Sequence, residues 1–250
     1  MARHRNFEIQ LENFRKEAAI ASQYIYCDMA IQHAASKSKK LLDRLNDTPV
    51  FWLACKAALQ SAGYISLGRI FDKNSKYNVD ALLEAMEKSI VIFQKEALAS
   101  RKRGEGTIDP PWLSEYLDSA YYPTIKDVKK IKAKVDEYRV VYERAIRPVR
   151  NKYIAHREKE ERAEVKALYS NGTVGDLWRL TTFLCQLHEV IWELLHNGRR
   201  PVFRPVRRSV KAIYDATTQR SLPPEKIVAD VKILMQFIET ATPHSGSKVT

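Results

Sequence analysis

The sequence has few of the residues on which tight turns and disulfide frameworks depend. Only 8 of its 250 residues are glycine and 3 are cysteine. So few glycines argue against a β-sandwich or β-barrel, because such folds need many tight turns. Cys27, Cys55 and Cys185 are odd in number and far apart, and no Cys-x-x-Cys pair is present. We therefore expect buried, unpaired cysteines, and neither a metal nor another cofactor.

Long apolar runs are also missing. No segment approaches the ~18 apolar residues of a membrane span. The amino-terminal segment carries charge every few residues and lacks the apolar core of a signal peptide. The sequence thus predicts a cytoplasmic protein with no membrane segment. With 42 Lys and Arg against 30 Asp and Glu, the net charge is +12, which suits a nucleic acid, an anionic lipid or an acidic protein as partner.

Apolar residues recur at helical spacing through nearly the whole chain. This spacing predicts helices over about 5–46, 51–71, 79–97, 112–120, 124–149, 174–197, 206–219 and 223–238. Residues 100–112 combine charge, two glycines and a Pro pair, and are predicted to be a loop. Apolar stripes need partners to pack against, and no repeat or composition break divides the chain. We predict an all-α fold: one helical bundle over 1–242, with 200–242 as additional C-terminal helices and 243–250 as a disordered tail.

Polar residues typical of helix ends mark several of these boundaries. Thr48 stands directly before Pro49, a pair that favours a helix start. Asn78 and Thr173 are typical N-cap residues in front of apolar stripes. Gly198 is a typical C-terminal stop.

Pro148 interrupts the longest stripe. It has no backbone N–H and clashes with the carbonyl of Arg144, and it disfavours helical geometry at Arg147. We therefore predict a break or restart here, with Arg150 in the first turn after it. Free backbone N–H groups would then lie beside a guanidinium, which suits a phosphate.

The residues after this break combine three chemical functions. Arg150 can stabilise charge that develops on a phosphoryl group. His156 titrates near neutral pH and suits proton transfer. Asn151 adds an amide that can orient a hydroxyl or an imidazole. In an α-helix, Arg150 and His156 would point about 120° apart, so both could line one broad groove.

Structural roles for the same residues remain open at this point. His156 continues the apolar stripe and could be a paired core histidine. Arg150 could form a salt bridge with one of the nearby glutamates. These are Glu158, Glu160 and Glu161. Asn151 could be a cap near the break.

The stretch from Arg150 to His156, which reads RNKYIAH, resembles the signature of the HEPN superfamily (higher eukaryotes and prokaryotes nucleotide-binding domain). That signature is an Arg with an adjacent polar residue, followed by a His after a gap of four to six residues. Upstream, Phe51-Trp52 and the run GYISLGRIFD over residues 63–72 resemble the phage abortive-infection branch. The resemblance covers roughly residues 5–200 and implies a HEPN-like helical bundle.

The resemblance implies a metal-independent endoribonuclease, often a toxin of toxin–antitoxin, abortive-infection or CRISPR systems. Its partners would be RNA, a second copy that brings two motifs to one cleft, and an antitoxin protein. His156 would act as general base or acid at the ribose 2′-hydroxyl or the leaving oxygen. Arg150 would hold the scissile phosphate, and Asn151 would position one of the two. The product would be a 2′,3′-cyclic phosphate. Some members carry a modifiable Tyr two residues after the His, where this chain has Glu158.

Basic residues accompany the motif. Arg147, Lys152 and Arg157 are predicted to bind nucleic acid as an electrostatic track, and a solvated surface is the alternative. Further basic residues near the motif are Arg144 and Lys159, and a second cluster holds Arg199, Arg200, Arg204, Arg207, Arg208 and Lys211. Two other readings of the chain compete with the nuclease. One is a non-catalytic HEPN module that binds nucleotide, RNA or a protein, and the other is a plain helical scaffold.

Overall fold

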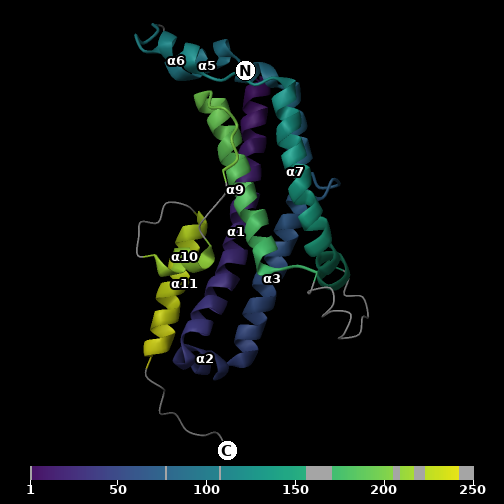
Figure 1. Cartoon of the computed structure of the whole chain (residues 1–250), viewed down its shortest axis with the longest axis vertical. Coiled ribbons are helices and arrows are strands. Elements are labelled where there is room, and N and C mark those ends of the chain that lie inside the picture. The colour runs from purple at the N-terminus through teal and green to yellow at the C-terminus, as the bar shows by residue number, and fades with distance from the viewer. Residues whose placement is uncertain are drawn as a thin grey trace, which may run out of the picture. The chain divides into compact units, whose positions relative to one another are not determined.

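The computed structural model describes residues 2–76, 78–106, 108–155, 171–204, 209–216 and 223–241. These residues form helices and connecting segments, and no strand occurs among them (Figure 1). The predicted all-α fold is therefore confirmed. No helix in the described ranges is long and apolar enough to cross a membrane.

Contacts divide the chain into two compact units. Unit 1 comprises Met1–Ala21 and Gly63–Val206, and unit 2 comprises Ser22–Ala62 and Arg207–Thr250. Two long helices, α1 (Ala2–Lys37) and α3 (Pro49–Phe71), each contribute to both units. The divisions after Ala21 and after Ala62 fall inside these continuous helices, where the sequence shows no composition break. The single domain over residues 1–242 stays a prediction.

Unit 1 contains most of the helices. Besides parts of α1 and α3, these are α4 (Val79–Lys88), η1 (Ile90–Phe93), α5 (Lys95–Arg103), α6 (Leu113–Ser119), α7 (Ile125–Ala145), η2 (Val149–Ala155) and α9 (Val174–Asn197). The predicted apolar stripes supply its core. Phe7 packs edge-on against Phe93 at 5.3 Å between ring centroids, and Tyr138 stacks on Phe183 at 3.8 Å.

The predicted helix ends are confirmed by their hydrogen bonds. The side chain of Asn78 accepts a hydrogen bond of 2.8 Å from the backbone N–H of Ala81 at the start of α4. Thr173 and Asp176 form a reciprocal capping box at the start of α9. Gly198 ends α9 with φ of 57°, a left-handed conformation that favours glycine.

Two predicted helices are divided in the structure. The segment 5–46 breaks at Ser38, whose hydroxyl caps α2 (Lys39–Asn46). The segment 79–97 divides into α4, η1 and the start of α5. The apolar pattern did not predict this division, because a short 3₁₀ turn continues an apolar stripe almost unchanged. The predicted loop over 100–112 is wrong in its first part, since α5 runs to Arg103. The charged residues there find acceptors at the end of α9: Arg101 donates to the carbonyl of Leu195 at 2.8 Å.

Unit 2 contains α2, α10 (Val210–Asp215), α11 (Pro223–Thr240) and the remaining parts of α1 and α3. Polar contacts join these helices. Lys37 of α1 pairs with Asp215 at 2.5 Å, and Gln60 of α3 donates to Asp28 of α1 at 3.0 Å. The three cysteines of the chain are free thiols, as predicted, but they are half-buried and not buried.

Candidate functional site around Arg150

The break predicted at Pro148 is present. Helix α7 ends at Ala145, and the short π-helical segment η2 begins at Val149 and carries Arg150 and Asn151. π-Helical turns inside or beside α-helices are rare and often lie at functional sites. The local sequence thus sets Arg150 at the start of an unusual turn that directly follows the break after α7.

Two details of the sequence prediction are changed by this turn. The backbone N–H of Arg150 donates to the carbonyl of Ile146 at 3.0 Å, so it is not one of the free N–H groups predicted beside the guanidinium. The 120° angle between Arg150 and His156 assumes α-helical spacing, which the π-helical turn does not have. His156 itself lies outside the described residues, as does Arg157.

The guanidinium of Arg150 is held by two side chains. Its Nη1 donates to Oδ2 of Asp72, which forms an ion pair with it. Its Nε and Nη2 donate to Oδ1 of Asn151 at 3.0 and 2.6 Å. These bonds use three of the five N–H donors that a guanidinium offers. The side chain keeps 19% of its surface exposed, and two of its N–H donors are not used by these contacts.

Asp72 is fixed from its other oxygen by Tyr142. The Tyr142 hydroxyl donates to Oδ1 of Asp72 at 2.8 Å. The Tyr142 ring is 1% exposed and stacks on Phe71 at 5.2 Å between centroids. Burial, followed by the hydrogen bond to Asp72, raises the pKa of Tyr142 well above its usual value. Tyr142 therefore stays protonated and keeps donating to Asp72.

Gly68 provides the space in which the Arg150 guanidinium lies. An ideal Cβ at Gly68 would stand 2.9 Å from both Cδ and Cζ of Arg150, and closer still to Nη1. Gly68 is one helical turn before Asp72, so both face Arg150 from the end of α3. No role in this site was predicted from the sequence for Gly68, Asp72 or Tyr142. The signal in the sequence was the spacing of four between Gly68 and Asp72, inside the run on which the resemblance rests.

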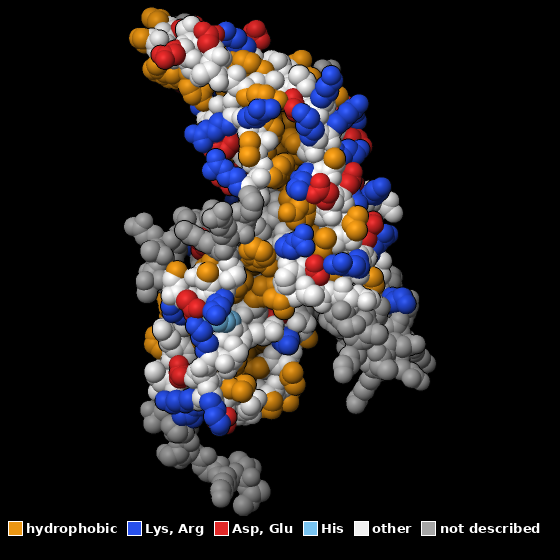
Figure 2. Space-filling view, viewed as in Figure 1, with side chains coloured by type: hydrophobic (Ala, Val, Ile, Leu, Met, Phe, Trp, Pro, Cys, Tyr) orange, Lys and Arg blue, Asp and Glu red, His pale blue; other side chains and the backbone are white. Residues whose placement is uncertain are grey.

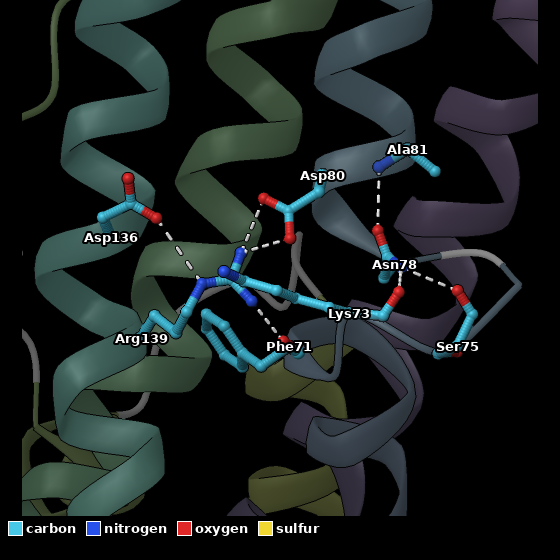
Figure 3. A network of polar contacts seen from close by, with 8 residues as sticks. All are labelled: Phe71, Lys73, Ser75, Asn78, Asp80, Ala81, Asp136 and Arg139. Carbon is cyan, nitrogen blue, oxygen red and sulfur yellow. Dashed lines mark hydrogen bonds and ion pairs between the residues drawn. The ribbon is translucent and has the colours of Figure 1, made fainter.

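A second arginine reaches the end of α3 beside this site (Figure 3). Arg139 of α7 donates through Nη2 to both oxygens of Asp80 at 2.7 Å and through Nη1 to the carbonyl of Phe71. Asp136 lies 3.5 Å from its Nε. Arg139 is 7% exposed and so has almost no contact with solvent. It links α7, α4 and the last residue of α3.

The turn between α3 and α4 is fixed by Asn78. Its amide nitrogen donates to the carbonyls of Lys73 at 2.8 Å and Ser75 at 2.7 Å (Figure 3). The same side chain caps α4 through its oxygen. Asp72, the first residue after α3, is thus followed by a turn with few remaining degrees of freedom.

The residues predicted to bind nucleic acid are exposed where they are described. Arg147 pairs with Glu143 of α7 at 3.6 Å, and Lys152 is exposed on η2. Arg144 lies 3.1 Å from Asp176 of α9. Figure 2 shows Lys and Arg side chains interspersed with Asp and Glu on the face that it views. Charges of both signs therefore lie near the exposed basic side chains, and the electrostatic track for RNA stays a prediction.

The histidines of α9 have structural surroundings. Burial, assisted by the positive charge of Arg15, lowers the pKa of His188 to about 4, so this imidazole is neutral near pH 7. His196 packs against Trp192 at 4.8 Å between ring centroids, and its Nε2 lies 3.9 Å from Glu8. Within the described segments, no group of three or more His, Cys, Asp or Glu is arranged to hold a metal ion.

Comparison with known protein families gives a match over most of the chain. The sequence model of the HEPN family AbiU2 matches residues 5–213. The matched segment contains Gly68, Asp72, Tyr142, Arg150 and Asn151, and also His156. No match was found among curated proteins or among solved structures.

Proposed function

Because the chain belongs to the HEPN family AbiU2, an abortive-infection branch of the HEPN superfamily, we propose that it is a metal-independent endoribonuclease. The observation that carries this proposal is the anchored Arg150. Its guanidinium is fixed by Asp72 and Asn151 at the Arg position of the HEPN signature. It also keeps N–H donors that the described contacts do not use, and these can donate hydrogen bonds to an RNA phosphate.

In the proposed reaction, the ribose 2′-hydroxyl attacks the adjacent phosphorus. A new 2′-O–P bond forms and the bond from phosphorus to the 5′-oxygen of the next nucleotide breaks. His156 takes the proton from the 2′-hydroxyl or gives a proton to the leaving 5′-oxygen. Arg150 stabilises the additional negative charge on the phosphoryl oxygens in the transition state. The products are a 2′,3′-cyclic phosphate and a 5′-hydroxyl, and no metal or other cofactor takes part.

The partners in this proposal follow the family resemblance. RNA is the substrate, and Arg147, Lys152 and Arg157 bind phosphates that flank the cleaved one. Such contacts release counterions, so binding weakens as salt rises. A second copy of the chain brings another Arg150 and His156 to the same cleft. An antitoxin protein restrains the enzyme in its host.

The contact between Asp72 and Arg150 also favours a second candidate. A guanidinium that is paired and mostly buried suits a helical scaffold, or a HEPN module that binds nucleotide, RNA or a protein without cleaving it. The two candidates differ in turnover. They can therefore be separated by a cleavage assay in which the fold is monitored.

The test is cleavage of a panel of RNAs, including tRNA, in EDTA. Wild type, His156→Ala and Arg150→Ala are compared, with circular dichroism to verify folding. Arg179→Ala removes an arginine from an exposed position of α9 and is the matched control. We expect wild type and Arg179→Ala to cut and leave cyclic phosphate ends, and the other two variants to be folded and inactive. A folded wild type that cuts no RNA on the panel would favour the non-catalytic module. Loss of folding in His156→Ala would favour a core histidine.

A further inference from the structure

Asp72 is placed so that its carboxylate cannot turn without losing a contact. One oxygen pairs with Arg150 and the other accepts the Tyr142 hydroxyl at 2.8 Å. Its backbone N–H donates to the carbonyl of Gly68 at 2.9 Å, which ties Asp72 to the last turn of α3. The carboxylate therefore gives Arg150 a fixed electrostatic and hydrogen-bonding partner.

The other donors of the guanidinium in contact are held by its sequence neighbour Asn151. Asn151 accepts two of its hydrogen bonds from within η2. Asn151 alone would let the pair move with η2, because both residues lie on the same segment. The contact with Asp72 fixes Arg150 relative to the end of a different helix, α3. Gly68 leaves the space in which the Arg150 guanidinium lies.

Arginine has a long side chain, and ordering it costs conformational entropy. If the protein orders the guanidinium before the substrate binds, that cost is not met in the transition state. Contacts that order Arg150 within the enzyme before RNA binds are therefore expected to affect the rate of the chemical step more than the affinity for RNA.

We infer that Asp72, in the space left by Gly68, positions the guanidinium of Arg150 for the substrate phosphate. The inference rests on the proposed ribonuclease function and assigns the residues that give its arginine a fixed position. Asp72 is a positioning residue, because it acts through Arg150 and does not touch the reacting atoms.

The first experiment compares Asp72→Asn with Asp80→Asn in steady-state RNA cleavage. Both variants remove one carboxylate charge from an Asp–Arg pair at the end of α3, and only the first changes the partner of Arg150. We expect Asp72→Asn to lower kcat by about 10- to 100-fold, with KM within about threefold of wild type. Asp80→Asn should keep the kcat of wild type per folded molecule. Equal kcat in Asp72→Asn and wild type would overturn the inference.

A second variant addresses the same geometry without removing a polar contact. In Gly68→Ala the new Cβ occupies the place of the guanidinium and forces Arg150 aside. Alanine is more favourable than glycine in the interior of a helix, so the midpoint of thermal unfolding should not fall. We expect kcat to fall about 10-fold or more. A purely structural role predicts the opposite pattern, with a lower midpoint and unchanged kcat. Should Asp72→Asn fail to fold, Gly68→Ala decides the question alone.

A third measurement does not depend on cleavage. A double-mutant cycle of Asp72→Asn and Arg150→Gln, followed by urea unfolding, measures the coupling between the two side chains. We expect a coupling that differs clearly from zero, and zero coupling would overturn the inference whatever the activity. A wild type that does not cut RNA would instead refute the proposed function, and the coupling would then still test whether Asp72 holds Arg150.

Discussion

Arg139 and Arg150 meet the end of α3 from neighbouring segments, and each pairs with an aspartate. Arg139 is 7% exposed, binds both oxygens of Asp80, and also donates to the carbonyl of Phe71. Arg150 is 19% exposed and shares its donors between Asp72 and the adjacent Asn151. The first arginine joins three helices, whereas the second has two N–H donors that the described contacts do not use. Identical residue types thus have different surroundings, and only the second arginine is proposed to bind a ligand.

The largest expected effect concerns stability. Arg139→Met should lower the free energy of unfolding by about 3–5 kcal/mol, because Asp80 would be left largely buried without its partner. Arg150→Met should cost only about 1 kcal/mol, because Asp72 keeps the hydrogen bond from Tyr142 and Arg150 is more exposed than Arg139. Urea unfolding of the two variants and wild type measures both values. Equal losses would remove the distinction between the two arginines.

Activity should show the reverse order. Arg150→Lys keeps the charge but loses the planar fork that Asn151 and Asp72 hold, so kcat for RNA cleavage should fall about 100-fold. Arg139→Lys, the matched substitution, should leave kcat per folded molecule unchanged. The folded fraction is determined by circular dichroism before each assay. A comparable loss in Arg139→Lys would mean that both arginines belong to one site.

Acid should weaken the helical core of unit 1 through His188. The pKa of His188 is lowered from 6.5 to about 4 by burial and by Arg15, so the unfolded chain binds its proton first as pH falls. The contribution to stability is complete above pH 6.5 and is lost between pH 6.5 and about 4. The free energy of unfolding should fall by about 2 kcal/mol. This is less than the full pKa shift of His188 would give, because its side chain still touches solvent.

His188→Gln is the control for this pH effect, because glutamine does not titrate. Wild type should lose about 2 kcal/mol more than this variant between pH 7 and pH 4 in urea unfolding. Other nearby groups are shared by both proteins, including Glu12, Arg15 and His196. Parallel pH profiles would show that His188 has an ordinary pKa.

The smallest effect is expected at Tyr142, which connects the two arginines. Its ring stacks on Phe71, whose carbonyl binds Arg139, and its hydroxyl binds Asp72. Tyr142→Phe keeps the ring and should cost about 1 kcal/mol of stability. The kcat for cleavage should fall only a few-fold, since Asp72 keeps Arg150. A loss as large as that in Asp72→Asn would assign the positioning role to the hydroxyl.

Local signals in the sequence were sufficient for most helix boundaries. Asn78, Thr173 and Gly198 act on residues within a few positions of themselves, so their effect can be derived from spacing. The division into units was not predictable in this way, because it falls inside α1 and α3. The extension of α5 into a charged segment depends on acceptors that α9 supplies from far along the chain.

The candidate site shows the same limit. The contact between Arg150 and Asn151 follows from their adjacency in the sequence. Asp72, however, is 78 positions from Arg150, and no periodicity connects them. The carboxylates close in sequence, Glu158, Glu160 and Glu161, lie outside the described residues, whereas Asp72 directly follows α3. Family resemblance marked the segment around Asp72 without giving its role, which only the folded arrangement supplies.

The π-helical turn η2 also bears on how such chains diverge. A π-helical turn closes its hydrogen bond over one residue more than an α-helical turn. Loss of one residue between Asn151 and Ala155 could therefore be absorbed by a return to α-helical winding, while the residues on either side keep their directions. The interval between an anchored arginine and a later histidine can then change by one residue over evolution without remodelling the surrounding helices.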